Sequence, residues 1–330
     1  MHKIKIAVIG VGNMGRYHAR VYSQLNNVEL VAVTDTNDVV GMKIAQEFNC
    51  QYYKDHNELL KKENIDAISI VVPTKLHKKI ALDVISHGKH LLIEKPIAAN
   101  SQDAKEIISM AKKKKVILMV GHIERFNPAV QKLKKIIKAG NLGEIISIIA
   151  RRVGVSPPKT NDANVIIDLA IHDIDVLSYL LNRQPTEAFA KGRKVLTSQV
   201  EDSAEIILSY DRVVGFIQVN WITPIKIRNL SVTGSNGYAE LNYITQALDI
   251  YKSKYIKESN SFGEFIKLGK PIKKKIKIQK KEPLLCEIEA FIRCVTTKIQ
   301  PLTTGEDGLK TLIVAEKALK SLKHGKIIKI

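Results

Sequence analysis

The chain has 330 residues and is 45% hydrophobic, enough for two packed domains and too much for one small core. It has no run of roughly 18 or more apolar residues and opens on "MHKIKIAVIGVG", so neither a membrane span nor a signal peptide is expected. Its net charge of +19 comes from scattered lysines without interleaved aromatics, which predicts a solvated surface and no nucleic-acid partner.

The three cysteines, Cys50, Cys286 and Cys294, form an odd count without metal-ligand spacing, so no metal site is predicted. Unbridged thiols are typical of a reducing compartment, and we expect a cytoplasmic protein. The positive field of the chain would favour an anionic substrate. A DNA-associated protein stays as an alternative suggested by charge alone, and it would require salt-dependent binding at physiological ionic strength.

Residues 1–123 are predicted to form an α/β domain with a doubly wound parallel sheet. Continuous apolar strands alternate there with amphipathic helices, which indicates a parallel sheet covered on both faces. The predicted strands are Ile4–Gly10, Val28–Asp35, Asp66–Pro73, His90–Glu94 and Val116–His122. The predicted helices are Met14–Leu25, Asp38–Phe48, Leu76–His87 and one that runs from a cap at Ser101 to Lys115.

Residues 124–330 are predicted to form a second α/β domain, in which strands dominate and the sheet is large, open and mostly antiparallel. Its strands are predicted at Ile145–Arg152, Glu187–Arg193, Ala204–Tyr210, Val213–Trp221, Ile227–Thr233, Gly237–Asn242 and Ala247–Tyr251. Its helices are predicted at Pro128–Ala139, Val165–Leu181, Leu284–Thr297 and Asp307–His324. The Lys-rich segment 253–283 is predicted to be an exposed excursion.

The motif "GVGNMG" places Gly10, Gly12 and Gly15 in the spacing of a dinucleotide-binding loop, directly after a strand and at the start of a helix. Asp35 ends the next strand, twenty residues after Gly15. Its carboxylate can accept hydrogen bonds from the adenosine ribose and repels a 2′-phosphate, so NAD is favoured over NADP. The loop residues predicted to contact NAD are Gly10, Val11, Gly12, Asn13, Met14 and Gly15.

Further polar residues follow the predicted strands at their carboxyl ends, where parallel sheets bind ligands. Lys95 lies in the stretch "HLLIEKPIA", and its ammonium group can stabilise negative charge on a reacting oxygen. Glu94 is expected to fix the position of Lys95, and Pro96 to set the direction of the turn. The residues predicted to line the cofactor site at these ends are Val72, Pro73, Thr74, His77, Glu94 and Lys95.

The stretch "DLAIHDIDVLSYLL" contains a second candidate group. Asp168 and His172 are four residues apart and therefore share one face of a helix. Histidine is the usual proton acceptor near neutral pH, especially beside a carboxylate. Two alternatives stay open at this point: a satisfied histidine inside the domain, and a metal ligand without further ligand spacing to support it.

In this order, the glycine motif, the Glu94-Lys95-Pro96 turn and the Asp168-x-x-x-His172 helix resemble the Gfo/Idh/MocA family of oxidoreductases over nearly the whole chain. The resemblance implies a Rossmann domain followed by an α/β domain that binds substrate and often mediates oligomerisation. It implies that Lys95 and His172 are the catalytic pair, with Asp168 beside them, and that the enzyme is an NAD-dependent dehydrogenase of a CH–OH group.

Three further segments are similar to the archaeal type of UDP-N-acetylglucosamine 3-dehydrogenases: "GHIERFNPAV", "RRVG" and "VNWITPIKIRNLSVTGSNGYAELNYITQ". This subfamily resemblance implies oxidation of the C3 hydroxyl of the nucleotide sugar, followed by a partner aminotransferase that leads toward the diamino sugars of surface glycans. It also implies a homodimer or homotetramer. The expected substrate contacts are His122, Glu124, Arg125, Asn127, Arg151 and Arg152, the two adjacent arginines meeting the pyrophosphate.

Several alternatives remain at the level of sequence. Arg151 and Arg152 are also typical of a charged strand edge or a subunit contact. The substrate can instead be a free sugar, an inositol or a biliverdin-like molecule within the same family. A non-catalytic NAD-binding regulator belongs to a different class, and the presence of both Lys95 and His172 argues against it.

Overall fold

The computed structural model describes residues 3–154, 164–196, 199–252, 255–260, 263–268 and 270–330. Its contacts divide the chain into two units, residues 1–126 with 282–313 and residues 127–281 with 314–330. The sequence predicted a single boundary after residue 123. Residues 282–313 return to the first unit because α8 (Pro283–Thr297) packs against α1 (Asn13–Gln24) and the segment Ile123–Phe126.

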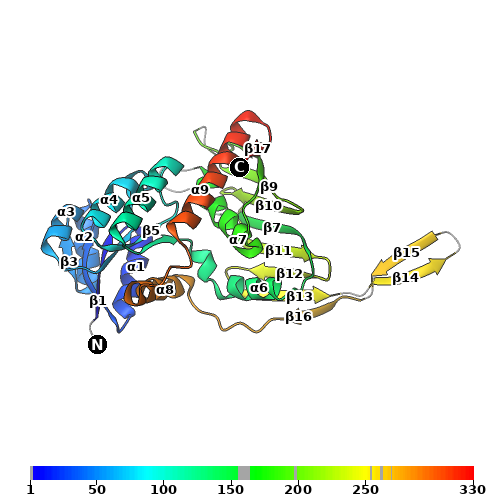
Figure 1. The fold of residues 1–330 in the computed structure, drawn as a ribbon, viewed down its shortest axis with the longest axis horizontal. Coiled ribbons are helices and arrows are strands. Elements are labelled where there is room, and N and C mark those ends of the chain that lie inside the picture. The colour runs from blue at the N-terminus through cyan, green and yellow to red at the C-terminus, as the bar shows by residue number, and fades with distance from the viewer. Residues whose placement is uncertain (1–2, 155–163, 197–198, 253–254, 261–262, 269) are drawn as a thin grey trace. The chain divides into compact units, whose positions relative to one another are not determined.

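The first unit contains a six-stranded parallel sheet with the strand order β3-β2-β1-β4-β5-β6. Figure 1 labels β1, β3 and β5 of this sheet. The order in which successive strands are added reverses between β1 and β4, and ligands bind beyond the carboxyl ends of the strands at such a point. The strands are β1 (Ile4–Ile9), β2 (Val28–Thr34), β3 (Gln51–Tyr53), β4 (Ala67–Ile70), β5 (His90–Glu94) and β6 (Leu118–Gly121). All pairings between them are parallel.

Both faces of this sheet are buried, because successive side chains of a strand point to opposite faces. In β1, Ile6 and Val8 belong to the core that includes α1, α2 and α8, while Ala7 and Ile9 belong to the core that includes α3, α4 and α5. The remaining helices of the unit are α2 (Asp38–Phe48), α3 (His56–Lys62), α4 (His77–Ser86) and α5 (Ser101–Lys114). The predicted doubly wound architecture is therefore confirmed.

Two local details of the first unit differ from the prediction. The short strand β3 and helix α3 were not predicted, since three residues of strand and seven of helix are too short for a clear periodic pattern. Helix α5 is capped by Asn100, whose side chain accepts a hydrogen bond from the backbone N–H of Asp103, and Ser101 is the first helical residue.

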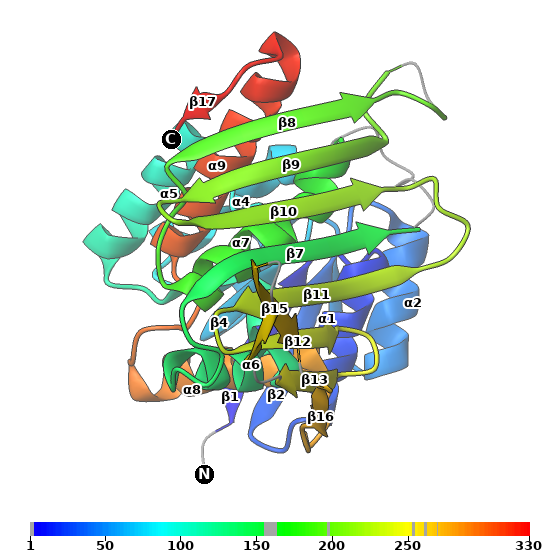
Figure 2. The same cartoon turned by 90° about the vertical axis from the view of Figure 1, so that its right-hand side faces the viewer.

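The second unit contains a nine-stranded sheet with the order β16-β13-β12-β11-β7-β10-β9-β8-β17 (Figure 2). The β7–β10 pair is parallel and the other pairings are antiparallel, as predicted for a mostly antiparallel sheet. The strands are β7 (Ile145–Val153), β8 (Glu187–Arg193), β9 (Ser203–Tyr210), β10 (Val213–Asn220), β11 (Ile227–Gly234), β12 (Gly237–Asn242), β13 (Ala247–Lys252), β16 (Ile272–Lys275) and β17 (Ile328–Lys329).

Helices cover one face of this sheet: α6 (Pro128–Lys138) contacts β12 and β13, and α7 (Ile171–Leu181) contacts β7 and β10. In β10, Ile217 and Val219 are buried on that side, whereas Val214 on the opposite face is 48% exposed. The last helix, α9 (Gly305–His324), begins in the first unit and ends in the second. Within the described ranges, no helix is long and apolar enough to cross a membrane.

Strands β14 (Tyr255–Asn260) and β15 (Gly263–Leu268) pair with each other in a separate two-stranded sheet. They belong to the segment 253–283, which was predicted to be an exposed excursion. Its residues 253–254, 261–262 and 269 lie outside the described part of the chain. From residue 270 to 282 the chain is mostly exposed, as predicted, and β16 adds an edge strand that the sequence did not predict.

Candidate active site

The loop between β1 and α1 contains the predicted dinucleotide motif. Gly10 has a φ of +84°, and a Cβ atom there would lie 2.5 Å from the carbonyl oxygen of Val71. A Cβ atom on Gly15 would lie 1.9 Å from the carbonyl oxygen of Gly10, so helix and loop can pack only without this side chain. A Cβ atom on Gly12, in contrast, meets no described atom within 4 Å. The open space at Gly12 is what backbone contact with a pyrophosphate requires.

The N-terminus of α1 also fits a pyrophosphate. Gly12 is the N-cap residue and provides no side chain to accept from the first N–H groups of the helix. The first turn contains no acidic residue. These N–H groups and the positive end of the helix dipole therefore remain suited to an anion. The residues of the motif, including Val11, Asn13 and Met14, would hold the two phosphates of NAD here.

A cavity of about 480 Å³ adjoins this loop, and Asp35 lies in its wall. The Asp35 Oδ2 atom accepts from the N–H of Val11 and Oδ1 from the N–H of Asn37, both at 2.9 Å. A carboxylate has about four lone-pair sites, so the hydroxyls of an adenosine ribose can still donate to it. The cavity is lined by Ile9, Gly10, Gly12, Thr34, Asp35, Thr36, Lys54, Asp55, His56, Val71, Val72, Pro73, Leu76 and Ile80.

Sequence reasoning missed Lys54, Asp55 and His56 in this wall, since the β3–α3 connection that supplies them was not predicted. Lys54 pairs with Asp38 at 2.7 Å, and His56 Nε2 lies 2.9 Å from a carboxylate oxygen of Asp83. The ammonium group of Lys54 and the imidazole of His56, which could attract a 2′-phosphate, thus already face carboxylates. The cavity matches a cofactor with a free ribose, which is NAD.

The predicted turn after β5 begins with Glu94, which lies opposite Gly121 of β6. The Lys95–Pro96 peptide bond is cis. Next to this turn, the buried ring of His77 connects two carbonyl oxygens, with Nδ1 2.8 Å from Pro96 O and Nε2 2.9 Å from Val72 O. A neutral imidazole has one N–H and can donate to only one of these two carbonyl oxygens, and burial lowers the pKa of His77. The ring lies between the turn and the segment that lines the cavity, and its direct contact with the cofactor stays a prediction.

The carboxylate of Glu94 is held from two sides. Its Oε1 atom lies 3.1 Å from His18 Nε2, and its Oε2 atom accepts from the backbone N–H of Lys95 at 3.1 Å. Burial alone would raise the pKa of Glu94, but the hydrogen bond from His18, the positive charge of Lys95 and the hydrogen bond from the Lys95 backbone outweigh it and hold this pKa below its ordinary value. A charged carboxylate therefore lies directly beside Lys95, and sequence reasoning did not identify His18 as its partner.

The other two candidate catalytic residues belong to the second unit. Asp168 lies in a π-helical turn, Ile166–Ala170, and His172 is the second residue of α7, which continues from that turn. The sequence predicted a continuous α-helix here, and π turns of this kind occur frequently at functional sites. Trp221 Nε1 donates to Asp168 Oδ2 at 3.2 Å, so the indole fixes the orientation of this carboxylate. His172 is half-buried.

The two adjacent arginines of β7 point to opposite faces of the sheet, because side chains alternate along a strand. Arg152 is buried against the helical layer, where its Nε and Nη2 atoms donate to the Asp173 carboxylate at 2.7 and 3.0 Å. Its guanidinium also lies 5.0 Å from the centre of the Tyr243 ring. This corrects the prediction that both arginines meet one pyrophosphate, since Arg152 is committed to a buried ion pair.

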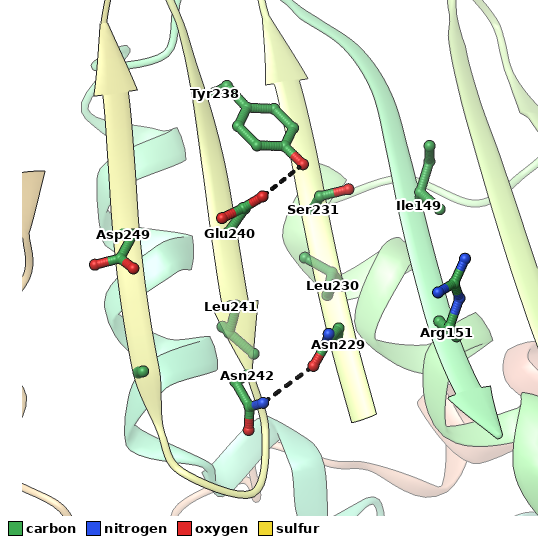
Figure 3. A pocket seen from close by; sticks show the side chains of 11 residues that line it. Ile149, Arg151, Asn229, Leu230, Ser231, Tyr238, Glu240, Leu241, Asn242 and Asp249 are labelled. Carbon is green, nitrogen blue, oxygen red and sulfur yellow. Dashed lines mark hydrogen bonds between the residues drawn. The ribbon is translucent and has the colours of Figure 1, made fainter. Parts of the chain in front are cut away.

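Arg151 points to the opposite, exposed face and lines a shallow pocket of about 350 Å³ there (Figure 3). The other polar residues of this pocket come from β11, β12 and β13. Figure 3 shows a hydrogen bond between two of them, Asn229 and Asn242. The distance between their side-chain amide atoms is 3.1 Å. Glu240 accepts from the hydroxyls of Tyr238 and Tyr251. Arg151 therefore lies on the sheet surface, which agrees with the alternative of a subunit contact.

Two of the predicted substrate contacts stabilise their own unit. Arg125 is 6% exposed, donates to the carbonyl oxygen of Leu302 at 3.1 Å and lies 3.5 Å from a carboxylate oxygen of Asp307. Asn127 caps α6 by accepting from the N–H of Ala129, and its amide donates to the carbonyl oxygen of Tyr243. Both residues were expected to contact substrate because they lie at the junction of the two predicted domains, and the hydrogen bonds described here give each of them a structural role.

The remaining two predicted substrate contacts, His122 and Glu124, lie between β6 and α6 in the sequence. His122 follows β6 and is 2% exposed, and Glu124 lies in the segment Ile123–Phe126 with a half-buried side chain. Lys95 belongs to the first unit, and Asp168 and His172 belong to the second. Each unit therefore carries part of the predicted chemistry, the cofactor residues with Lys95 in one and the candidate proton acceptor in the other.

Two family models match the chain. The model of the oxidoreductase family with an NAD-binding Rossmann fold, GFO_IDH_MocA, matches residues 4–122, and that of the GFO/IDH/MocA C-terminal domain matches residues 130–240. The chain is 27% identical over 315 residues to the UDP-N-acetylglucosamine 3-dehydrogenase of Acidithiobacillus ferrooxidans, covering 96% of each chain. It is also 27% identical to the scyllo-inositol 2-dehydrogenase (NAD(+)) of Bacillus subtilis, covering 98% of this chain and 95% of the other.

The solved structure of the Acidithiobacillus ferrooxidans enzyme has the same fold. It superposes with a TM-score of 0.85 at 26% identity and covers 98% of this chain and 99% of the other. Both the nicotinamide-binding unit and the large sheet are therefore shared over almost the full length of the two proteins.

Proposed function

Because the chain belongs to the Gfo/Idh/MocA family of NAD-dependent dehydrogenases acting on CH–OH groups, we propose that it oxidises the C3 hydroxyl of UDP-N-acetylglucosamine to the 3-oxo nucleotide sugar. The observation that carries this proposal is the full-length match to a UDP-N-acetylglucosamine 3-dehydrogenase, which extends through both units. The net charge of +19 supports an anionic nucleotide sugar over a neutral polyol.

In the proposed reaction, Lys95 and His172 act on one oxygen of the substrate. His172 accepts the proton of the C3 hydroxyl, and the ammonium group of Lys95 donates a hydrogen bond to the same oxygen as negative charge develops. Bound NAD supplies the hydride acceptor for the hydrogen of C3. Asp168, oriented by Trp221, holds either a neighbouring substrate hydroxyl or the imidazole of His172. The C3–H and O–H bonds break, and a C=O bond forms.

A second candidate substrate is inositol. The scyllo-inositol 2-dehydrogenase of Bacillus subtilis has the same 27% identity, and the myo-inositol 2-dehydrogenase of Thermotoga maritima is 24% identical over 99% of this chain and 98% of its own. Oxidation of an inositol hydroxyl would use Lys95 and His172 in the same roles. The two proposals therefore differ in the substrate pocket and not in the chemistry.

A substrate panel distinguishes them. Purified protein is incubated with NAD and UDP-N-acetylglucosamine, its uronic acid, UDP-glucose, glucose, myo-inositol or scyllo-inositol, and NADH is followed by absorbance. An aminotransferase that consumes the ketone is included, since formation of a ketone from an alcohol by NAD is unfavourable. Turnover of UDP-N-acetylglucosamine above all others supports the proposal. Turnover of an inositol with none of the nucleotide sugar would replace it with the second candidate.

We propose that the enzyme is a homodimer or homotetramer that uses the exposed face of its large sheet. Residues on four neighbouring strands are in direct register on this face: Phe189 opposite Ile207, Ile207 opposite Phe216, and Phe216 opposite Ile149. Ile207 and Ile149 are 40% and 47% exposed. A continuous apolar row of this kind is unusual on an exposed surface. A second copy of the same face would cover it, as in an isologous interface.

The chemistry of the product suggests the next reaction step, and the unbridged thiols suggest the compartment. A 3-oxo sugar is an electrophilic ketone, so the proposed next step is transfer of an amino group by a separate aminotransferase, which gives a diamino sugar. Cys50, Cys286 and Cys294 are all unbridged, and the cytoplasm would keep them reduced. We therefore propose a cytoplasmic enzyme that works upstream of an aminotransferase.

A further inference from the structure

A chain of buried polar side chains lies behind Glu94 in the first unit. The side chain of His18 on α1 is completely buried, with Nε2 3.1 Å from Glu94 Oε1 and Nδ1 3.2 Å from Ser69 Oγ. Ser69 on β4 is also fully buried, and its Oγ atom lies 2.7 Å from the hydroxyl of Tyr22. The chain Tyr22–Ser69–His18–Glu94 thus runs between α1 and the strands β4 and β5 to the residue before Lys95.

The donors and acceptors of this chain have a definite direction at Glu94. The ionised carboxylate can only accept, so His18 must carry its proton on Nε2 toward Glu94. Burial raises the pKa of Tyr22, which therefore keeps its proton and can donate to Ser69. Ser69 can then donate to His18 Nδ1. The whole chain is satisfied with a neutral imidazole, and a charged imidazole would still present Nε2–H to Glu94.

On its other side, the Glu94 carboxylate is confined by β6 and by the turn. A Cβ atom at Gly121 would lie 3.1 Å from the carboxyl carbon of Glu94, so the glycine leaves just enough room for this group. The second carboxylate oxygen accepts from the backbone N–H of Lys95 at 3.1 Å. The carboxylate thus links the imidazole of His18 to the backbone of Lys95.

A side chain that only filled space at position 18 would not need to form hydrogen bonds to Glu94 and Ser69. The buried neighbours of His18 on α1 include Ala19 and Val21, and burying a polar group is costly unless its hydrogen bonds are made. The chain nevertheless places an imidazole here, with both nitrogens aimed at polar partners and one of them at the carboxylate beside Lys95. We infer that His18 is a positioning residue, which holds the Glu94 carboxylate and through it the backbone and charge environment of Lys95.

This inference rests on the catalytic role proposed for Lys95. The test compares His18→Leu, which removes the donor, with His18→Gln, whose amide can still donate to Glu94, and with the control Ser23→Ala on the exposed side of the same helix. Loss of positioning at a catalytic group typically costs on the order of 10²-fold in rate. We expect His18→Leu to lower kcat by about 10- to 100-fold. NAD affinity should stay within about threefold, His18→Gln should recover most of kcat, and Ser23→Ala should match the wild type.

A merely structural role predicts a different result. If His18 only filled space, His18→Leu would keep wild-type kcat, or it would lose kcat and NAD affinity together with thermal stability, and His18→Gln would give no rescue. Either pattern would overturn the inference. Should His18→Leu fail to fold, His18→Asn takes its place, since its shorter amide cannot reach Glu94. It should then show the loss of kcat that His18→Gln repairs.

A second readout does not require turnover. Nitrogen-15 spectra of the nine histidines in the free protein should show His18, identified by its loss in His18→Gln, as protonated on Nε2. Its ring signals should move in Glu94→Gln. A ring protonated on Nδ1 alone would contradict the proposed chain.

If Lys95→Ala keeps normal turnover while the His18 signals behave as expected, the proposed role of Lys95 fails and the His18–Glu94 pairing stands. Loss of kcat in Lys95→Ala but not in His18→Leu would overturn the positioning role alone.

Discussion

Gly12 and Gly15 belong to the same motif but serve different purposes. At Gly15 the helix approaches the loop so closely that a methyl group would collide with the Gly10 carbonyl, whereas the space beside Gly12 is open. One glycine is thus required by the fold, and the other by the ligand that the loop binds. The dinucleotide motif predicts this difference from sequence, with Gly12 beside the pyrophosphate and Gly15 at the close packing of helix and strand, and the short distance at Gly15 agrees with it.

We predict that Gly12→Ala folds normally and loses the cofactor. Its φ of −62° is accessible to alanine, so the free energy of unfolding should stay within about 1 kcal/mol of the wild type. The new methyl group occupies the space needed for the pyrophosphate, and the Kd for NAD should rise by about tenfold or more. Urea unfolding and calorimetric titration with NAD measure the two quantities.

Gly15→Ala is the matched comparison, and it should lower the stability of the protein itself. Its methyl group must displace backbone, so unfolding should be easier by about 1–3 kcal/mol or more before any cofactor is added. Equal stability of the two variants would show that the loop geometry described here is wrong.

Lys95 is predicted to act on the rate and not on cofactor binding. Lys95→Ala removes the ammonium group that stabilises the developing charge on the substrate oxygen, and loss of one such donor typically costs about 10²- to 10³-fold in kcat. Because Lys95 does not line the cavity in which we propose that NAD binds, the Kd for NAD should change little. Near-normal turnover of Lys95→Ala would exclude the proposed role.

At the scale of single elements, strand β7 shows what alternation does to neighbouring residues. Arg151 and Arg152 are adjacent and chemically identical, yet one is exposed on the sheet surface and the other is buried beside Asp173. The sequence predicted the strand correctly. It did not predict the faces, because Asp173 lies on α7 and its distance from β7 depends on tertiary packing.

This difference gives a stability prediction. Arg152→Leu leaves the fully buried carboxylate of Asp173 without its ionic partner, and breaking such a pair costs about 3–5 kcal/mol. Arg151→Leu, an identical change at an exposed site, should alter the free energy of unfolding by no more than about 0.5 kcal/mol. Denaturant unfolding of both variants at one protein concentration makes the comparison, and similar losses would contradict the assigned faces.

The elements that could be predicted from sequence are those with a strong local pattern. Helices α2 and α6, strands β5 and β8 and the glycine loop agree with the prediction to within a residue or two. Three features could not be predicted: the π turn at Asp168, the edge strand β16 and the cap at Asn100. Each depends on particular hydrogen bonds, and the local sequence is equally compatible with a structure that lacks them. The site was predicted in part for the same reason: Asp35 and Lys95 directly follow strands β2 and β5, whereas His18 becomes relevant only through its distance to Glu94.

For the whole molecule, the exposed face of the large sheet determines the expected assembly. The row Phe189–Ile207–Phe216–Ile149 joins four strands, and a stable interface requires about 800 Å² from each partner. We predict that Phe216→Glu dissociates the oligomer, because it places a charge in the centre of the covered row. The control is Ile299→Glu, the same kind of change at an exposed apolar residue of the first unit.

Light scattering after size exclusion measures this effect directly. The wild type and Ile299→Glu should give the mass of a dimer or tetramer, and Phe216→Glu should give about 37 kDa, close to the chain mass of 36.9 kDa. A wild-type protein that elutes as a monomer, or a Phe216→Glu protein that remains oligomeric, would exclude this face as the interface.

We propose that the enzyme removes hydride from C3 of a nucleotide sugar, and isotopic labelling follows this transfer. UDP-N-acetylglucosamine with deuterium at C3 is incubated with the protein, NAD and a ketone-consuming aminotransferase, and the reduced cofactor is analysed by mass spectrometry. We expect NADH that is one mass unit heavier, formed from this substrate and not from the inositols. Unlabelled NADH, or NADH formed from an inositol alone, would contradict it.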